Sequence, residues 1–345
     1  MVLIITHSKD NDGHFSGAIC QYFEETIRGT LPLEINYLRW SYGDKDPNID
    51  ELQKYERIYV LDLTLNSSIM EFLAKGYRGS IVWIDHHVAN YEKLAPEIHN
   101  LIPGTRSGES AACILTWEWW LNFIEPNKIE TIFHFNEKVY DAFPALELDE
   151  SILVKTDPEW PNNRSIYPYW LYFSGCYDIW KYSNTELWNK FIIPHEYYLR
   201  STVDGPSGAL EVIKNYFSCI ESKSIPDISQ YIRTGSLVYR YQEKRNKATA
   251  ANLYKASVFN EITRSKVNCL VINTLERGSK VFDNVSQELR DWADYFILWN
   301  CSGKKYKYSA YSEKENIFVP NLKIRGESFG GHPHAGGVVC EKRLI

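Results

Sequence analysis

Short apolar runs in the first part of the chain each end in histidine or aspartate side chains. The groups that follow residues 2–6, 58–61 and 81–84 are, in that order, His7 with Asp10 and Asp12, Asp62 alone, and Asp85 with His86 and His87. Each run is short and apolar enough to be a buried strand. In a parallel α/β sheet the carboxyl ends of the strands meet at one edge, where such proteins bind their ligands. We therefore expect these side chains to lie close together.

Carboxylates and neutral imidazoles crowded at one sheet edge repel one another or lose solvation unless a divalent cation neutralises them. Mixed oxygen and nitrogen ligands suit Mn²⁺ or a similar first-row ion. Two such ions, typically ~3.5–4 Å apart, polarise a phosphoryl group and supply a hydroxide nucleophile near neutral pH. The ligand types therefore predict a two-metal site that hydrolyses a phosphate ester, with Mn²⁺ as the expected ion and Mg²⁺ or Co²⁺ as alternatives.

In these residues the chain resembles the DHH phosphoesterases. Five motifs are matched in the family's order: His7-x-x-Asp10-x-Asp12-Gly13, Asp62, Asp85-His86-His87, Asp178 within residues 175–181, and the glycine-rich segment 329–337. The last motif resembles the signature of the DHH-associated C-terminal domain. Segment 106–119 and the sequence Asp178-Ile179-Trp180 are similar to the oligoribonuclease-like and cyclic-nucleotide-phosphodiesterase-like members. The resemblance implies a metal-dependent phosphoesterase.

The resemblance also implies a role for each matched residue. The metal ligands would be His7 and Asp10 on one ion, Asp12, His86 and Asp178 on the other, and Asp62 as the bridge. Asp85 would orient an imidazole as an outer carboxylate. His87 would contact the substrate phosphate, so Asp85 and His87 are both assigned to catalysis. His14 is extra to the pattern and is interpreted as a surface histidine at a helix start, outside the ligand set.

The glycine-rich segment near the end of the sequence is interpreted as a substrate site. Successive glycines let backbone N–H groups approach an anion closely in a nest, and a histidine adds a donor. The residues assigned to it are Gly330, Gly331, His332, His334 and Gly336. Tyr311 stands where many family members carry a phosphate-reading arginine, so it is assigned to base stacking and Arg325 to phosphate contact. Strand packing for Tyr311 and solvated surface charge for Arg325 are open alternatives.

The order of the expected elements indicates two α/β domains. Expected strands at 33–38, 58–61 and 81–84 alternate with helices at 17–28, 67–75 and 109–123, the last with Ser107 as its N-cap. This alternation is typical of a doubly wound parallel sheet. After an irregular region at 126–172, a helical stretch at 228–256 precedes strands at 267–273, 295–299 and 306–311 and a helix at 282–292. We expect a DHH catalytic domain at 1–200, a helical connection at 201–260 and a smaller mixed-sheet substrate-binding domain at 261–345, with the active site in the cleft between the domains.

Composition excludes some partners and compartments. The chain has 345 residues, a formal net charge of −6 and seven cysteines without a Cys-x-x-Cys pair. This charge gives no basic footprint for long duplex DNA, and the cysteines argue against a disulfide framework. The sequence shows neither a basic leader nor an apolar run long enough to span a membrane. We expect a cytoplasmic protein that acts on a short single-stranded oligonucleotide or a small nucleotide, without membrane partners; a homodimer is compatible with the sequence.

Together these features predict a metal-dependent phosphodiesterase that hydrolyses short oligonucleotides to nucleoside 5′-monophosphates. Two activities of the same chemistry stay open: a cyclic nucleotide or dinucleotide phosphodiesterase, and a phosphatase of a 3′,5′-bisphosphorylated nucleotide. A manganese-dependent pyrophosphatase is disfavoured by the glycine-rich motif. An inactive nucleotide-binding module is the alternative of another class, and the complete set of metal ligands speaks against it.

Overall fold

The computed structural model describes residues 1–42, 44–142, 165–183, 185–275, 279–332 and 334–345. The chain divides into two compact units, Met1–Tyr239 and Arg240–Ile345. None of the described helices is long and apolar enough to cross a membrane.

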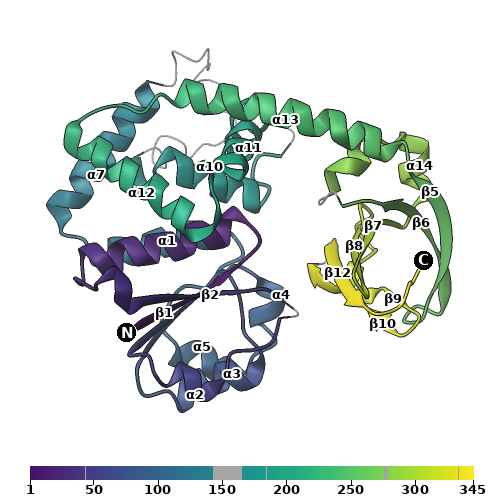
Figure 1. Ribbon diagram of the computed structural model, residues 1–345, viewed down its shortest axis with the longest axis horizontal. Coiled ribbons are helices and arrows are strands. Elements are labelled where there is room, and N and C mark those ends of the chain that lie inside the picture. Colours follow the sequence, from purple (N-terminus) through teal and green to yellow (C-terminus); the bar gives the residue numbers. More distant parts are fainter. Residues whose placement is uncertain (43, 143–164, 184, 276–278, 333) are drawn as a thin grey trace. The chain divides into compact units, whose positions relative to one another are not determined.

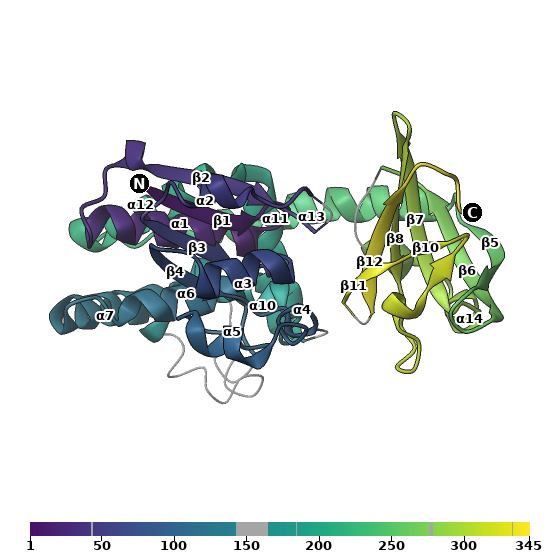
Figure 2. The same ribbon diagram turned by 90° about the horizontal axis from the view of Figure 1, so that it is seen from below.

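The first unit is built on a four-stranded parallel sheet. Its strands are β1 (Val2–His7), β2 (Ile35–Trp40), β3 (Arg57–Leu61) and β4 (Ser80–Ile84). They are ordered β2-β1-β3-β4, as Figure 2 shows, and every neighbouring pair is parallel. The strands β1, β3 and β4, which precede the candidate ligands, are therefore adjacent. The predicted parallel α/β sheet is confirmed.

Helices cover both faces of this sheet, because successive strand residues alternate between two apolar cores. Ile4 and Tyr59 belong to the core on one face, and Ile5 and Val60 belong to the core on the other. The first face packs against α1 (Asn11–Thr26), α6 (Ala112–Leu121), α10 (Tyr169–Asp178) and α12 (Gly205–Ser222). The second packs against α2 (Ile49–Leu52), α3 (Ser67–Lys75) and α5 (Pro96–Leu101), which Figure 1 shows on the opposite side of the sheet.

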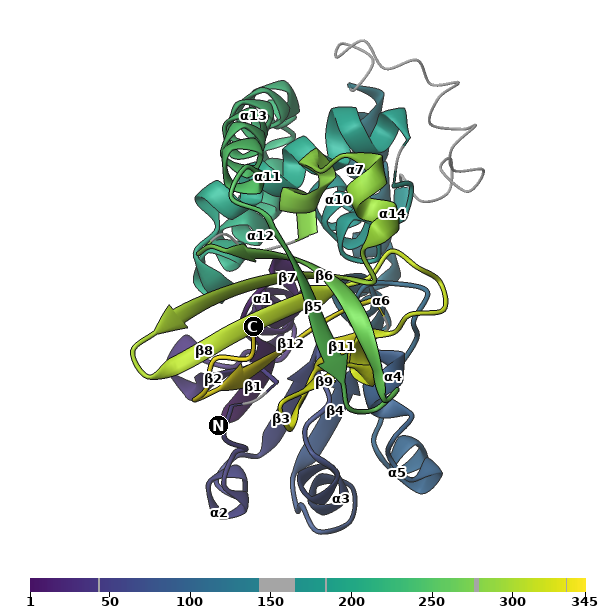
Figure 3. The ribbon, with the colours of Figure 1, turned by 90° about the vertical axis from the view of Figure 1, so that its right-hand side faces the viewer.

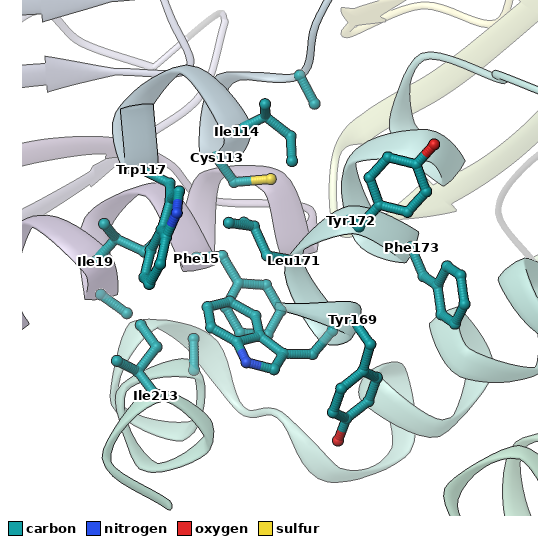
Figure 4. Close-up of a cluster of buried hydrophobic side chains, with 14 of the residues drawn as sticks. Phe15, Ile19, Cys113, Ile114, Trp117, Tyr169, Leu171, Tyr172, Phe173 and Ile213 are labelled. Atoms are coloured by element: carbon teal, nitrogen blue, oxygen red, sulfur yellow. The ribbon is translucent and has the colours of Figure 1, made fainter. Parts of the chain in front are cut away.

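The core between the helices of the first face is aromatic and holds α10 in place. Phe15 from α1, Trp117 from α6 and Ile213 from α12 surround residues of α10 such as Leu171 in Figure 4. The ring centroids of Phe15 and Trp170 lie 4.9 Å apart. Because α10 ends at Asp178, this packing fixes the position of a predicted metal ligand that is far from the others in sequence.

The first unit also contains further described helical segments. They are the 3₁₀ turn η1 (Pro32–Glu34), α4 (Val88–Tyr91), α7 (Pro126–Asp141), the π-helix η3 (Trp188–Ile192) and α11 (Ile193–Thr202). A long helix, α13 (Ile228–Ala250), begins in the first unit and ends in the second.

The second unit contains a six-stranded mixed sheet (Figure 3), as predicted. Its strands are β5 (Tyr254–Asn260), β6 (Ser265–Asn273), β7 (Tyr295–Ser302), β8 (Lys305–Tyr311), β11 (Gly330–His332) and β12 (Ala335–Cys340). They are ordered β11-β12-β8-β7-β6-β5, and β6 and β7 form the parallel pair. The smaller elements are η4 (Ser279–Asn284), α14 (Gln287–Trp292), η5 (Val319–Asn321) and the paired strands β9 (Lys323–Ile324) and β10 (Glu327–Ser328).

Several expected boundaries are wrong. Helix α1 begins six residues before the expected position 17, because Asp10 caps it. Residues 126–141 form a helix where we expected an irregular region, while residues 143–164 of that region lie outside the described residues. The expected helix at 228–256 ends at Ala250, and β5 precedes the strand that we expected to be the first of the second domain. The expected helix at 282–292 is divided between η4 and α14.

A segment at residues 103–107 runs along the end of β4 and supports the residues that follow it. The backbone N–H of Trp83 donates to the carbonyl oxygen of Pro103 at 2.9 Å, and that of Asp85 donates to Thr105 at 3.2 Å. The Arg106 guanidinium donates to the Trp83 carbonyl oxygen at 3.0 Å. The close approach requires glycine at position 104, where φ is +130° and a Cβ would lie 2.0 Å from the Trp83 carbonyl oxygen.

Replacing Gly104 by alanine should therefore cost more than replacing an uncrowded glycine of positive φ. We expect Gly104→Ala to lower the free energy of unfolding by about 2 kcal/mol or more, since both the backbone conformation and the contact are unfavourable. Gly29 has φ +67° and open space where a Cβ would lie, so Gly29→Ala should cost only about 1 kcal/mol. Thermal and urea unfolding measure both, and equal losses would contradict the role given to Gly104.

Candidate metal centre

The turn from β1 into α1 carries the first group of ligands. His7 is the last residue of β1, and Asp10 is the N-cap of α1, whose Oδ1 accepts a hydrogen bond from the Gly13 backbone N–H at 3.1 Å. The other oxygen of Asp10 lies 2.7 Å from His7 Nδ1. One aspartate therefore starts the helix and also faces the imidazole at the strand end.

Asp12, in the first turn of α1, is held by the amino end of a second helix. The backbone N–H groups of Ala112 and Cys113, which begin α6, donate to Asp12 Oδ2 at 2.9 Å and to Oδ1 at 2.6 Å. Free N–H groups at a helix start favour a negative charge there. The expected N-cap role of Ser107 is wrong: the N-cap position is Ala111, and Ser107 Oγ accepts from Glu109 N–H instead. The carboxylate of Asp12 takes the capping role.

Asp62 follows β3 directly and is the most constrained of the ligands. Its φ of 61° lies in the left-handed region, which few residues other than glycine adopt. Its carboxylate is buried, and Oδ1 accepts no hydrogen bond from the described residues. His86 Nε2 lies 3.3 Å from Oδ1, and His7 Nδ1 lies 3.8 Å from Oδ2. Asp62 therefore faces both histidines.

The Asp85-His86-His87 turn divides its side chains between two tasks. Asp85 is fully buried, and its Oδ2 accepts a hydrogen bond from the Thr64 hydroxyl at 2.5 Å. Its Oδ1 accepts two hydrogen bonds from His87, one from the backbone N–H at 3.1 Å and one from Nδ1 at 2.8 Å. Asp85 therefore orients the imidazole of His87. His86 points its Nε2 toward carboxylates instead, at 3.5 Å from Asp12 Oδ2 and 3.3 Å from Asp178 Oδ2.

These contacts bring all six predicted metal ligands together. The described residues contain three groups whose possible ligand atoms all lie within 4.8 Å of one another: His7, Asp10 and Asp62; Asp12, His86 and Asp178; and Asp62, His86 and His87. The first group contains His7, Asp10 and Asp62, and the second contains the three residues expected on the other ion without the expected bridge Asp62, so the assignment of ligands to each ion stays a prediction. The third is weaker as a separate site, because His87 Nδ1, at 3.7 Å from Asp62 Oδ1, already donates to Asp85.

The electrostatics of the centre favour a bound cation. Burial raises the pKa of Asp62 and of Asp178 well above the usual range, and the neighbouring charge of Asp12 raises both further. Burial also lowers the pKa of His86, so its imidazole is neutral and has a lone pair to donate. Buried carboxylates that repel one another, together with a neutral imidazole, fit a divalent cation.

His87 differs from His86 in its protonation. Burial alone would lower the pKa of His87, but its hydrogen bond to Asp85 and the charge of that carboxylate outweigh burial and raise it. The same pair lowers the pKa of Asp85 against the effect of its own burial. Because a carboxylate only accepts, the Nδ1 of His87 carries a proton. The geometry favours His86 as a ligand atom donor and His87 as a hydrogen-bond donor.

His14 lies beside the centre but in none of the three ligand groups. It is buried, so its interpretation as a surface histidine is wrong. Its Nε2 lies 3.4 Å from the Ser8 carbonyl oxygen and 3.4 Å from Arg39 Nη2. Burial lowers its pKa, so it is neutral near pH 7. Its exclusion from the ligand set stays a prediction.

The residues assigned to the substrate belong to the second unit. Gly330, Gly331 and His332 lie in β11 and pair in antiparallel register with Gly337, Gly336 and Ala335 of β12. A Cβ at position 336 would lie 2.0 Å from the Gly330 carbonyl oxygen, so close strand pairing requires this glycine. Tyr311 ends β8, the Phe318 and His334 rings lie 5.5 Å apart, and Arg325 donates to the Arg343 carbonyl oxygen at 3.0 Å. Their roles in substrate binding stay a prediction.

Sequence reasoning missed the side chains that support the ligands. Thr64, which donates to Asp85, lies two residues after Asp62 and has no motif of its own. Glu196 is buried and accepts a hydrogen bond from Asn11, which stands between Asp10 and Asp12. Glu196 and Arg200 are four residues apart on α11, a spacing that normally indicates a solvated surface pair. Only the fold shows that this glutamate is buried beside the ligands.

No protein-family model and no curated protein matches the chain. Similar solved structures include an exopolyphosphatase-related protein from Bacteroides fragilis, with 15% identity and a TM-score of 0.43 over 97% of this chain and 85% of the other. The exonuclease RecJ bound to manganese has 12% identity and a TM-score of 0.42, covering 97% and 84% of the two chains. The pGpG-specific phosphodiesterase PggH from Vibrio cholerae has 12% identity and a TM-score of 0.37, covering 99% and 92%. Similarities this distant carry no argument about the function of this chain.

Because the carboxylates are crowded, replacing Asp62 should change the stability of the metal-free protein and of the metal-bound protein in opposite directions. Near neutral pH the raised pKa of Asp62 means that its ionised form destabilises the folded protein, and this penalty grows as the pH rises above the ordinary carboxyl pKa. Asp62→Asn should therefore raise the melting temperature of the metal-free protein. It should also remove the stabilisation by Mn²⁺, which reaches about 2.7 kcal/mol at a hundred times the dissociation constant of a site.

Thermal unfolding with and without Mn²⁺ measures both effects. The control is Asp283→Asn, which changes an exposed carboxylate of the second unit and should leave both values unchanged. A metal-free Asp62→Asn protein that is less stable than the unsubstituted protein would contradict the proposed repulsion.

Substitutions of two histidines distinguish a predicted metal ligand, His86, from a nearby buried histidine, His14. We expect His86→Asn to weaken Mn²⁺ binding by about 100-fold or more, since it removes a direct ligand, whereas outer contacts typically cost 10–100-fold. His14→Asn changes a buried histidine outside the ligand groups and should keep the affinity of the unsubstituted protein. Titration calorimetry and metal analysis of the purified proteins give both values. Equal losses would mean that the ligand assignment is wrong.

Proposed function

We propose that this protein is a metal-dependent phosphoesterase of the DHH type, and more narrowly a phosphodiesterase that hydrolyses short oligonucleotides to nucleoside 5′-monophosphates. The observation that carries the proposal is the pair of ligand groups that meet at Asp62. His7 and Asp10 lie on one side of this carboxylate, and His86 joins it to Asp12 and Asp178 on the other.

The ligand types specify the chemistry. His7, Asp10 and Asp62 would hold one divalent cation, and Asp12, His86 and Asp178, with Asp62 as the shared ligand, would hold the second. Two bound cations would neutralise phosphoryl oxygens and lower the pKa of an attacking water. A purely structural metal would need no shared carboxylate between two adjacent groups, so the arrangement supports hydrolysis over a structural role.

The chain's own residues supply orientation and a proton donor. Asp85, fixed by Thr64, holds His87 at Nδ1 and raises its pKa, which favours the form of the imidazole that carries a second proton at Nε2. A charged donor next to the ligands stabilises the negative charge that develops on phosphoryl oxygens. We propose this role for His87, with Asp85 as its positioning residue.

Two features support a short oligonucleotide as the substrate: the net charge of the chain and the proposed substrate-binding residues of the second unit. A net charge of −6 offers no general attraction for a long polyanion, whereas a short substrate needs few contacts. Tyr311 and the glycines of β11 and β12 are the proposed contacts for its base and phosphate. Mn²⁺ is the proposed physiological ion because the ligands combine carboxylates with imidazoles.

Turnover of a substrate panel tests the proposal. The panel contains a dinucleotide, a longer oligonucleotide, a cyclic nucleotide, a cyclic dinucleotide and a 3′,5′-bisphosphorylated nucleotide, each with Mn²⁺. We expect fastest cleavage of the short linear substrates, and a loss of about 10³-fold or more in kcat/KM for both Asp62→Asn and His86→Asn, because each removes charge stabilisation at the reacting phosphate. His14→Asn is the control that keeps activity.

The panel also ranks the alternatives. Preferred cleavage of a cyclic substrate, or release of phosphate from the bisphosphorylated nucleotide, would replace the oligonucleotide assignment by that activity. No turnover of any member, or turnover that survives both substitutions, would refute the metal-dependent phosphoesterase itself.

A further inference from the structure

The ligand groups contain no permanent cation, although a phosphate ester brings further negative charge to the centre. All members of the three described groups are aspartates and histidines. The bound metals would be largely neutralised by these aspartates, so a fixed positive side chain beside them would add to the attraction for substrate. Arg200 of the first unit is a candidate for this role.

Arg200, on α11, is held beside the ligands by a buried acid. Its Nε donates to Glu196 Oε1 at 2.8 Å, and this carboxylate also accepts a hydrogen bond from Asn11 Nδ2 at 3.1 Å. The side chain of Glu196 is 4% exposed, whereas that of Arg200 is 49% exposed. The buried acid therefore fixes one edge of a guanidinium whose remainder reaches the surface.

Two aromatic rings fix the plane of the same guanidinium. Its central carbon lies 5.1 Å from the centroid of Tyr177 and 5.7 Å from that of Tyr197. Tyr177 is stacked on Trp188, with centroids 5.3 Å apart and planes 3° from parallel. A guanidinium held on an aromatic face keeps its donors in a fixed plane, which suits a planar, two-pronged contact with an oxyanion.

Two of the residues that contact Arg200 or its partner Glu196 adjoin the ligand set of the second predicted metal. Tyr177 immediately precedes Asp178, and Asn11 immediately precedes Asp12. The guanidinium is therefore linked, through Tyr177 and through Glu196 with Asn11, to the residues that adjoin two predicted ligands.

The outer edge of the guanidinium is available to a ligand. Within the described part of the chain, the hydrogen bonds and ion pairs of Arg200 all use Nε, and neither Nη1 nor Nη2 has a protein acceptor. Two other arginines of the first unit differ. Arg57 donates hydrogen bonds from Nε and Nη2 to Glu24 and Thr30. Arg106 donates from both terminal nitrogens to backbone carbonyl oxygens. Arg200 combines a fixed position with open donors.

We infer that Arg200 is a substrate-binding residue that grips a phosphate of the substrate beside the Asp12, His86 and Asp178 group, with Glu196, Tyr177 and Tyr197 holding it in place. The inference rests on the proposed function, because the phosphate it would bind is that of the ester to be cleaved. It would also supply, from the first unit, the phosphate-reading arginine whose family position is occupied by Tyr311.

Binding of inorganic phosphate to the full-length, Mn²⁺-loaded protein tests this inference without requiring turnover. The variants are Arg200→Gln, Arg200→Lys and the matched control Arg57→Gln, which also removes an arginine from a buried glutamate but at the opposite end of β3 from Asp62. Calorimetry gives the phosphate dissociation constant, and metal analysis gives the Mn²⁺ content.

We expect Arg200→Gln to weaken phosphate binding by about 10- to 100-fold at unchanged Mn²⁺ content, since it removes charge-assisted hydrogen bonds. Arg200→Lys should lose less, because it keeps the charge without the planar fork. Arg57→Gln should bind phosphate like the unsubstituted protein. Phosphate affinities of Arg200→Gln and Arg57→Gln within about two-fold of each other, or a loss of Mn²⁺ in Arg200→Gln in proportion to the loss of phosphate, would overturn the inference.

A second measurement uses the unsubstituted protein, so it does not depend on a variant that folds. Phenylglyoxal modifies arginines, and mass spectrometry follows each position separately. Phosphate should slow the modification of Arg200 in the Mn²⁺-loaded protein and leave the exposed Arg78 unchanged. Equal rates at Arg200 with and without phosphate would overturn the inference, while failure of the whole substrate panel would refute only the proposed function.

Discussion

The constraint on which this structure depends is the mutual repulsion of buried carboxylates at the carboxyl edge of the first sheet. Asp12 and Asp62 are almost inaccessible to water, and the pKa of their neighbour Asp178 is raised by burial and by the charges of Asp12 and Asp10. Two unit charges about 4 Å apart repel by about 4 kcal/mol at the effective dielectric constant of a partly buried site. Binding of divalent cations would neutralise these buried carboxylates and remove their mutual repulsion.

Asp12 and Asp85 are held by hydrogen bonds that do not depend on a metal. The first turn of α6 donates two backbone N–H groups to Asp12, and Thr64 with His87 fixes Asp85. Asp62 is held by its backbone, in a left-handed conformation that costs of order 1–3 kcal/mol for a residue other than glycine. The side chains are thus placed before an ion arrives, so little ordering of the ligands opposes binding.

The sequence predicted the strands and the ligands that follow them because both signals are local. Apolar runs indicate buried strands, and a parallel sheet brings their ends together, so Asp62 and His86 were expected to be neighbours. Asp178 could be assigned only through the resemblance to a known family, since its position depends on aromatic packing of α10. The cap of α6 was predicted wrongly for a similar reason: Ser107 is near in sequence, but Asp12 reaches the helix start through the fold. Helix α7 was missed because its aromatic and proline-rich surroundings hide its periodicity.

The pair of Glu196 and Arg200 shows why spacing along the sequence can give a wrong prediction of burial at such a site. Four residues apart on a helix, these charges are normally a solvated pair that contributes little to stability. Here one partner is buried and shared with Asn11, so the pair links α11 to the turn that carries the ligands. An arginine held only by its charge could turn away from an approaching anion. Because the carboxylate takes Nε and an aromatic ring takes one face, rotation is restricted and the terminal donors keep one direction. Glu196 offsets part of the charge of Arg200, but it also gives the remaining donors a defined geometry, which suits a two-pronged contact with an oxyanion.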